Sequence, residues 1–168
     1  MQFLLLITAL LPTASAFTPL RSATDELQIR NKLSLYAIAL DTKNLVLLDQ
    51  VFTPDAVIVY PGPAASILHG LPALKTYLGK ALTGFVTQHT LSTTVVEQTD
   101  GREGVNSTVY LVANYLGQGN LTGSVAYFHG TYFDVWTKQK GEWKSKARTL
   151  ELLPPGPVGN LAILSSPN

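Results

Sequence analysis

The spacing of hydrophobic residues divides the chain into two parts. Between residues 24 and 82 apolar side chains recur every three or four positions, and after residue 89 they recur at every second position. The first spacing places apolar residues on one face of a helix, and the second places them on one face of a strand. The sequence therefore predicts helices in the first half and a β-sheet in the second half.

The first predicted helix begins after Ser22 and ends near Asp41. Residues 22–25 have the spacing of a capping box, in which side chains satisfy the free backbone N–H groups of the first turn. The apolar stripe that follows consists of Ile29, Leu33, Tyr36, Ala37 and Leu40. A stripe of this kind is typical of a helix that packs one face against a core.

Two more helices are expected before the sheet. The second is short, and it ends where Pro54 biases the preceding residue away from the helical conformation. Its apolar residues are Leu45, Leu48 and Phe52. A short strand over residues 56–60 follows and ends at a Pro-Gly-Pro turn. Pro72 suits the first turn of the third helix. The stripe of that helix consists of Leu71, Leu74, Leu78 and Leu82.

Four strands separated by turn signals are predicted in the second half. They cover residues 89–98, 105–116, 124–137 and 143–152. The turns are marked by Asp100-Gly101, the glycine-rich segment 117–123 and Lys140-Gly141. Helices followed by such a meander predict an α+β domain, a cone-shaped barrel in which a curved, mostly antiparallel sheet wraps around the N-terminal helices. A cavity at its open mouth would hold a small, mostly apolar ligand.

The composition excludes several classes of function. The 168 residues carry 12 Lys and Arg against 11 Asp and Glu, which gives a net charge of +1. Because the two signs are interspersed, no basic patch is available for nucleic acid or for an anionic membrane. The chain has no cysteine, so disulfides, a thiolate nucleophile and cysteine-ligated metals are excluded. Its three scattered histidines make a poor metal site, so we expect no metal.

Secretion is predicted from the N-terminus and from two sequons. Residues 1–16 combine a short apolar run with a small-x-small cleavage pattern, as in a signal peptide. Asn106 and Asn120 each begin an Asn-x-Ser/Thr acceptor for N-glycosylation. We therefore expect a glycoprotein that is secreted or resides in the secretory lumen. It would comprise an α+β domain over residues 17–153 and a Pro/Gly-rich tail over residues 154–168, with no membrane helix after cleavage.

Several segments resemble a known family. They are residues 29–33, 36–41 and 52–56 with Leu48 and Tyr60, and then residues 88–89, 132–136 and 141–144 with Arg148. Together these segments resemble the SnoaL-like domains of the nuclear transport factor 2-like superfamily, over roughly residues 25–152. The resemblance implies the cone-shaped fold. It leaves the reaction open, because the superfamily includes dehydratases, isomerases, cyclases, epoxide hydrolases and non-catalytic binders.

Within this superfamily, the sequence is similar to the scytalone dehydratase family. The catalytic aspartate and histidine of that family would fall on Asp41 and His89, and one of its water-holding tyrosines would fall on Tyr60. The family's second tyrosine, its serine and its asparagine would fall on Leu40, Gly130 and Tyr132. The resemblance therefore implies a similar acid–base pair, with different groups orienting the substrate.

The same residues support acid–base chemistry on physical grounds. An imidazole titrates near neutral pH, so His89 could take a proton from carbon or oxygen and return it. Asp41, accepting from the other ring nitrogen, would fix the tautomer. Tyr60 could donate a hydrogen bond to a carbonyl or developing enolate oxygen. The substrate-binding candidates are Tyr36, Asn114 and Tyr132. Such a set suits elimination of water, keto–enol isomerisation or ring closure without a cofactor.

Each candidate also has a structural interpretation. His89 could satisfy a loop carbonyl, Asp41 could cap the second helix, and Tyr60 could pack on the third helix. His129 is expected on the opposite sheet face from Tyr132 in a structural role, and His69 is expected in a solvent-facing loop.

Asp134 and Arg148 could face each other on adjacent strands. We favour a structural ion pair between them. The alternative is a pair that polarises an epoxide or activates water, as in the epoxide hydrolases of the superfamily.

Three functions are consistent with this sequence. The first, which we favour, is a secreted dehydratase, isomerase or cyclase that acts on a small aromatic or polyketide-like metabolite, for example in fungal secondary metabolism. The second is a non-catalytic protein that holds an apolar metabolite. The third is an interaction module, such as a homodimer formed through the outer face of the sheet. Contact between Asp41 and His89 beside an open cavity would favour the first function.

Overall fold

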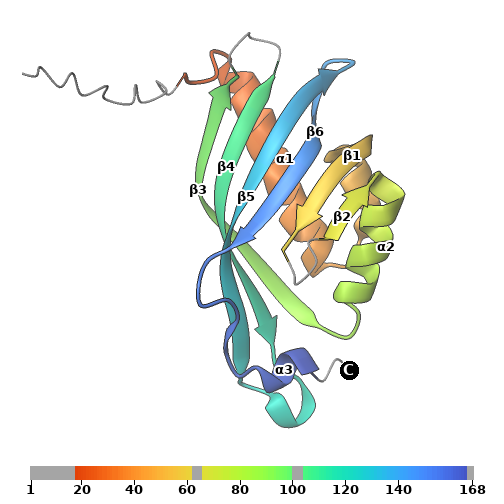
Figure 1. Cartoon of the computed structure of the whole chain (residues 1–168), viewed down its shortest axis with the longest axis vertical. Coiled ribbons are helices and arrows are strands. Elements are labelled where there is room, and N and C mark those ends of the chain that lie inside the picture. Colours follow the sequence, from red (N-terminus) through yellow and green to blue (C-terminus); the bar gives the residue numbers. More distant parts are fainter. Residues whose placement is uncertain (1–17, 62–65, 100–103, 166–168) are drawn as a thin grey trace, which may run out of the picture.

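The computed structural model describes residues 18–61, 66–99 and 104–165 (Figure 1). Its helices are α1 (Ala23–Asp41), the 3₁₀ helix η1 (Leu45–Gln50), α2 (Leu71–Ala81), the 3₁₀ helix η2 (Gly119–Leu121) and α3 (Ala162–Ser165). Its strands are β1 (Phe52–Tyr60), β2 (Ser66–His69), β3 (Val86–Gln98), β4 (Val105–Leu116), β5 (Val125–Gln139), β6 (Glu142–Leu152) and β7 (Val158–Gly159). The predicted signal peptide and the Asp100-Gly101 turn lie outside the described residues, so both stay predictions.

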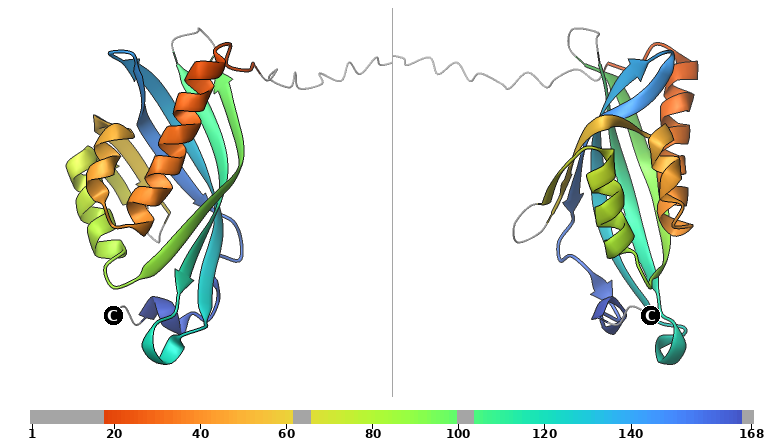
Figure 2. Two further views of the ribbon diagram at one scale, coloured as in Figure 1. Left: turned by 180° about the vertical axis from the view of Figure 1, so that it is seen from behind. Right: turned by 90° about the vertical axis from the view of Figure 1, so that its right-hand side faces the viewer.

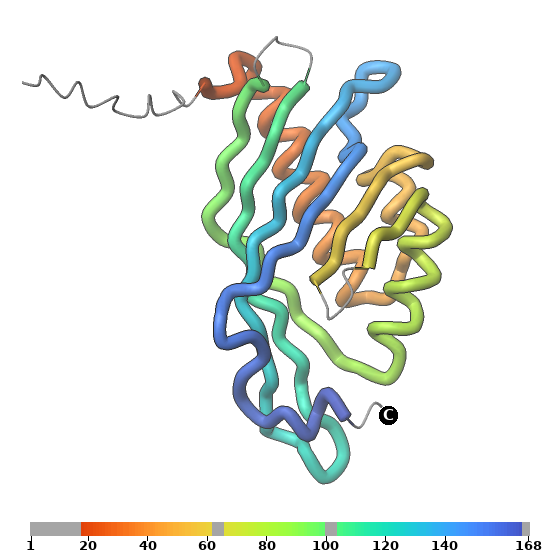
Figure 3. Tube along the Cα trace, viewed as in Figure 1, coloured from red at the N-terminus to blue at the C-terminus, as the bar shows by residue number. Residues whose placement is uncertain are grey.

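One curved sheet of seven strands forms the body of the fold. Its order is β2-β1-β6-β5-β4-β3, and β7 pairs with β5. Strands β3 to β6 form the predicted antiparallel meander, while β1 runs parallel to β6. Figure 2 shows α1 lying across one face of the sheet, and Figure 3 shows the strong twist of the long strands. The α+β class is confirmed, with a sheet that stays open along one side.

The core lies between α1 and the concave face of the sheet. The Ser22 side chain accepts a hydrogen bond from the Asp25 backbone N–H at 3.2 Å, so the predicted cap forms. The stripe of α1 is buried, and in β4 the buried apolar residues are Val105, Val109, Leu111 and Ala113. Because these positions alternate, they share one sheet face, which packs against the helix.

The second helix ends earlier than predicted, because β1 begins at Phe52 and includes Pro54. The register between β1 and β6 shifts between Phe52 and Val57. Proline lacks a backbone N–H, and it is tolerated at such an irregularity because no ladder hydrogen bond is lost there.

Two short strands were not predicted. Strand β2 pairs antiparallel with β1 at the sheet edge, and it places the exposed His69 in a strand rather than in a loop. The tail contains β7 on β5 and then α3, whose Ile163 is buried. None of the described helices is long and apolar enough to cross a membrane.

Candidate active site

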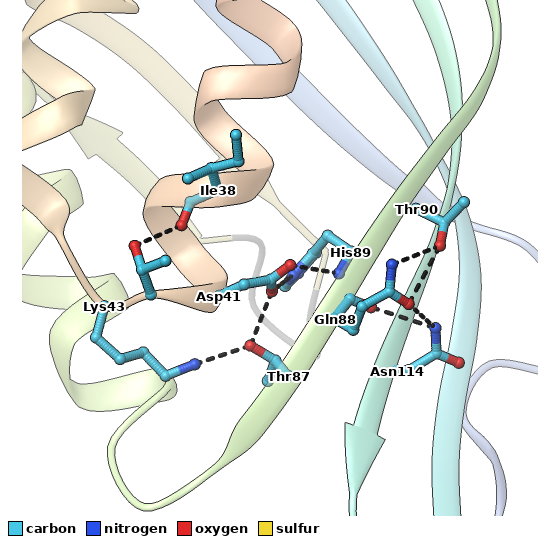
Figure 4. A network of polar contacts seen from close by, with 9 residues as sticks. Ile38, Asp41, Lys43, Thr87, Gln88, His89, Thr90 and Asn114 are labelled. Atoms are coloured by element: carbon cyan, nitrogen blue, oxygen red, sulfur yellow. Dashed lines mark hydrogen bonds and ion pairs between the residues drawn. The ribbon is translucent and has the colours of Figure 1, made fainter.

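Asp41 and His89 come from distant parts of the chain and meet beside a cavity. Asp41 is the last residue of α1, and His89 lies near the start of β3. The His89 Nδ1 atom lies 2.6 Å from Asp41 Oδ1, and the His89 backbone N–H donates to Asp41 Oδ2 at 2.8 Å (Figure 4). The same residue of β3 therefore holds both carboxylate oxygens, which fixes the orientation of Asp41 relative to the imidazole ring.

This geometry determines which nitrogen of His89 is available for chemistry. Asp41 accepts the Nδ1 proton, so the neutral ring carries its lone pair on Nε2. Among the described residues, no hydrogen-bond partner is recorded for Nε2, and His89 lines the cavity. An imidazole held this way can accept a proton at Nε2, while the carboxylate stabilises the imidazolium that forms.

Thr87 and Lys43 extend this pair into a chain of four side chains. Thr87 is buried, and its hydroxyl donates to Asp41 Oδ1 at 3.0 Å. Lys43 Nζ donates to the same hydroxyl at 2.8 Å (Figure 4). Because the lysine ammonium can only donate, the hydroxyl proton is directed toward Asp41. The sequence reasoning missed both residues, since neither is a catalytic type at a recognisable spacing.

The hydrogen bonds determine the charge state of Asp41. Burial raises the pKa of this carboxyl, but the hydrogen bonds from His89 and Thr87 outweigh burial and hold the pKa below its ordinary value of 3.8. Asp41 is therefore ionised at neutral pH, as a partner for an imidazolium requires.

The lowered pKa predicts how the effect of Asp41→Asn on stability depends on pH. A carboxyl whose pKa is lower when folded contributes stability above its ordinary pKa and loses it as pH falls through the folded pKa. Urea unfolding should show the variant less stable than wild type at pH 7, with the difference shrinking below about pH 3.8. A difference that stays constant between pH 7 and pH 3 would contradict this assignment.

Aromatic and leucine side chains line an open cavity of about 190 Å³ next to His89. Its aromatic lining residues are Tyr36, Tyr60, Tyr77, Tyr115, Phe128 and Tyr132. Its aliphatic lining includes Leu40, Leu78, Leu82, Leu150 and Leu152. The Tyr60 and Tyr77 rings stack with their centroids 5.0 Å apart. A lining of this kind favours flat, mostly apolar ligands with a few oxygen atoms.

The Tyr36 and Tyr60 hydroxyls lie 2.8 Å apart at the buried side of the cavity. One of them must donate to the other, so the second hydroxyl keeps a proton for a ligand. Burial raises the pKa of Tyr60 well above its ordinary value, and the neighbouring Tyr36 adds to this rise. Burial does the same for Tyr132, whose ring packs edge-on against Tyr36 at 5.5 Å. The Tyr60 and Tyr132 hydroxyls are therefore protonated at neutral pH.

Comparison with known proteins identifies the family. The model of the SnoaL-like domain matches residues 21–149, which is most of the chain. The chain belongs to the SnoaL-like domain family. No curated protein matches it.

Solved structures with the same fold include several proteins with enzyme names. One, provisionally designated an aromatic ring hydroxylase from Novosphingobium aromaticivorans, is 23% identical with a TM-score of 0.70, over 86% of this chain and 99% of that chain. Another from that organism, provisionally designated a scytalone dehydratase, is 22% identical with a TM-score of 0.64, over 77% and 85%. The hexachlorocyclohexane dehydrochlorinase LinA type 2 is 15% identical with a TM-score of 0.67, over 82% and 93%. At these identities the likeness shows the fold.

Asn114 does not belong to the cavity of this SnoaL-like domain, contrary to the prediction. It lies on β4 one residue beyond the buried Ala113, so its side chain points to the outer face of the sheet. There its amide donates to the side-chain oxygen of Gln88 at 3.0 Å (Figure 4). Gly130 has no side chain to offer a ligand. A side chain would not fit at this position, because a Cβ atom there would lie 2.8 Å from the Glu151 carbonyl oxygen.

Asp134 and Arg148 form the predicted ion pair, buried beneath the tyrosines. Arg148 Nε and Nη2 donate to the two Asp134 oxygens at 2.8 and 3.0 Å, and Ser145 Oγ donates to Oδ1 at 2.9 Å. The guanidinium carbon lies 4.1 Å from the centre of the Tyr36 ring and 4.3 Å from that of Tyr132. Burial lowers the pKa of Arg148, but Asp134 more than offsets it, so the guanidinium stays charged. The pair supports the rings whose hydroxyls face the cavity.

The remaining histidines lie away from the cavity. His129 is exposed on the outer face of β5, where its ring packs edge-on against Tyr127 at 5.5 Å. His69 is exposed at the end of β2. Within residues 18–61, 66–99 and 104–165, no group of three His, Cys, Asp or Glu side chains could hold a metal ion.

Proposed function

We propose that this SnoaL-like protein is an enzyme that moves protons within a small aromatic or polyketide-like molecule, as a dehydratase, isomerase or cyclase. One observation carries the proposal: the His89 ring, oriented by Asp41, and the Tyr36–Tyr60 hydroxyl pair border the same cavity. Enolisation requires a base and a hydrogen-bond donor that line the same small cavity.

The reaction would proceed in two proton transfers. His89 Nε2 takes a proton from a carbon next to a carbonyl, and the C–H electron pair moves into a carbon–carbon double bond. The carbonyl oxygen gains negative charge and accepts a hydrogen bond from the tyrosine pair. The imidazolium, stabilised by Asp41, then gives its proton to another carbon, which completes an isomerisation. If it gives the proton to a departing hydroxyl, water is eliminated. Every group in this scheme comes from the chain, so the proposal requires no cofactor.

Deuterium exchange tests the first step without knowledge of the product. Ketones that contain an aromatic ring, such as 2-tetralone, would be incubated with the protein in D₂O, and loss of the proton signals next to the carbonyl would be followed by NMR. We expect exchange faster than in buffer. Ketones that bind, as seen by shifted protein signals, without faster exchange would instead support a non-catalytic binding protein.

Removing the Tyr60 hydroxyl should slow exchange with little effect on packing. Tyr60→Phe keeps the ring that stacks on Tyr77 and removes one member of the hydroxyl pair. Loss of one donor to a developing oxyanion typically lowers the rate by about 10²–10³. The rate constant at saturating ketone measures this effect. Tyr110→Phe, on the exposed outer face of β4, is the matched control and should leave the rate unchanged.

We also propose that the protein passes through the secretory pathway, with Asn120 as its main glycan site. Asn120 is exposed within η2, whereas Asn106 is half-buried on β4 between two neighbouring strands. An acceptor in an exposed turn is accessible to a bulky modification. When the proteins are expressed in a eukaryotic secretory system, the Asn120→Gln variant should lack the mass of one glycan relative to the wild type. The Asn106→Gln variant should differ little from the wild type in glycan mass. An intact mass without any glycan would contradict the proposal.

A further inference from the structure

A second hollow, larger than the cavity, lies at the C-terminal end of α2. Its volume is about 530 Å³, and its walls come from the turn after α1, the end of α2 and the start of β3. The apolar part of the wall includes Leu45, Leu82, Phe85 and Val86. We call this hollow the α2 groove. It lies outside the proposed reaction site, since neither His89 nor the Tyr36–Tyr60 pair lines it.

The α2 groove and the cavity are neighbours that share a wall. Leu78 and Leu82 line both spaces. Phe85, which lines the groove, packs edge-on at 5.4 Å against Tyr115, which lines the cavity. Because the two spaces are separate but adjacent, ligands could occupy both at the same time. A binding test must therefore distinguish the groove from the cavity.

Lys43 gives the α2 groove a single charge. Among the described residues that line the groove, it is the only titratable one, and the other polar lining side chains are Thr83 and Gln118. Its ammonium donates one hydrogen bond, to the neutral Thr87 hydroxyl. Among the described residues, no carboxylate lies within ion-pair distance of Lys43. Two of the three ammonium protons therefore remain for a ligand.

We propose that the α2 groove binds an amphipathic carboxylate, an acid group joined to an apolar chain or ring. The carboxylate would accept hydrogen bonds from Lys43 Nζ, and the apolar part would lie along the leucines and Phe85. Charge-assisted hydrogen bonds of this type are stronger than neutral ones, and burial of apolar surface adds to them. A neutral ligand would gain only the second contribution, and a cationic ligand would be repelled by Lys43. This inference does not depend on the proposed reaction.

Calorimetric titration with octanoate tests the proposal, with octylammonium as the charge-reversed probe of equal length. We expect octanoate to bind and octylammonium to bind at least tenfold more weakly. Lys43→Met should weaken octanoate binding about tenfold or more, the loss expected for a hydrogen bond to a charged group. Lys80→Met removes an exposed lysine near the end of α2 that does not line the groove, so it should leave binding unchanged.

Two further variants decide which space is occupied. Gly79 lines the groove, and a Cβ atom there would meet Leu45 at an ordinary 3.8 Å, so Gly79→Phe should fold and block the groove. Leu152→Trp would fill the cavity instead. The proposal expects Gly79→Phe to abolish octanoate binding and Leu152→Trp to preserve it. The reverse pattern, equal binding of both probes, or full affinity in Lys43→Met would overturn it.

Discussion

Replacing His89 with alanine is expected to remove the catalysed part of ketone deuterium exchange. Among the described residues that line the cavity, His89 is the only one with a ring nitrogen or carboxylate that could act as a general base, and burial raises the pKa of the Tyr60 and Tyr132 hydroxyls well above its ordinary value. General base catalysis by a positioned side chain contributes about 10²–10⁴ to a rate. The exchange rate of the variant should therefore fall by this factor, toward the rate in buffer.

The controls separate chemistry from folding. His129→Ala removes the exposed histidine on the outer face of β5 and should leave exchange unchanged. Asp41→Asn keeps the shape of the His89 partner but offers an amide that can donate, so the preferred tautomer is lost and the rate should fall substantially. If purified His89→Ala keeps the fold and the wild-type exchange rate, His89 is not the base and the proposed mechanism is wrong.

The structure also shows why Thr87 and Lys43 matter for this test. The Thr87 hydroxyl lies between the Lys43 ammonium and Asp41 Oδ1, so the proton on the hydroxyl points at the carboxylate. Removing the Thr87 hydroxyl would leave the Asp41 carboxylate with one hydrogen-bond donor fewer. A ligand carboxylate in the α2 groove would bind the same lysine through its other ammonium protons, so exchange should be measured in buffers that lack organic acids.

Much of the fold could be predicted because local patterns and tertiary packing agree. The stripe of α1, its Ser22 cap and the alternation in β4 each indicate a buried face, and the structure buries those faces. The same alternation indicates an outward Asn114, because Val109, Leu111 and Ala113 point inward. An amide side chain has the chemistry of a substrate-binding group, but the position of Asn114 in the strand places it on the outer face.

The tyrosine cluster could be predicted only in part. Tyr36 lies on the buried stripe of α1 and Tyr60 ends a strand, but their hydroxyl contact depends on how β1 packs against the helix. Tyr77 lies three residues after the buried Leu74, so helical spacing indicates that it faces inward beside the apolar stripe. The α2 groove forms where the turn after α1, the stretch 78–86 and Gln118 meet, and no local pattern reports such a meeting.

The largest effect on stability is expected from a substitution at Arg148, because both partners of its ion pair with Asp134 are buried. The side chains of Arg148 and Asp134 have no exposed surface. Arg148→Met would leave the Asp134 carboxylate in the core with Ser145 as its remaining side-chain donor. Removing one partner of a buried ion pair typically costs about 3–5 kcal/mol, because the other charge stays desolvated and unpaired. The free energy of unfolding in urea should fall by this amount.

The double variant distinguishes the charge from the packing around it. Asp134→Leu in the Arg148→Met background removes the stranded carboxylate, so most of the lost stability should return. The surface pair of Lys75 and Asp49, 2.7 Å apart, is the matched control, and Lys75→Met should cost less than about 1 kcal/mol. Because the guanidinium lies against the Tyr36 and Tyr132 rings, the double variant should still exchange ketone protons more slowly than wild type. Recovery of stability together with full exchange activity would show that Arg148 holds the core without positioning the tyrosines.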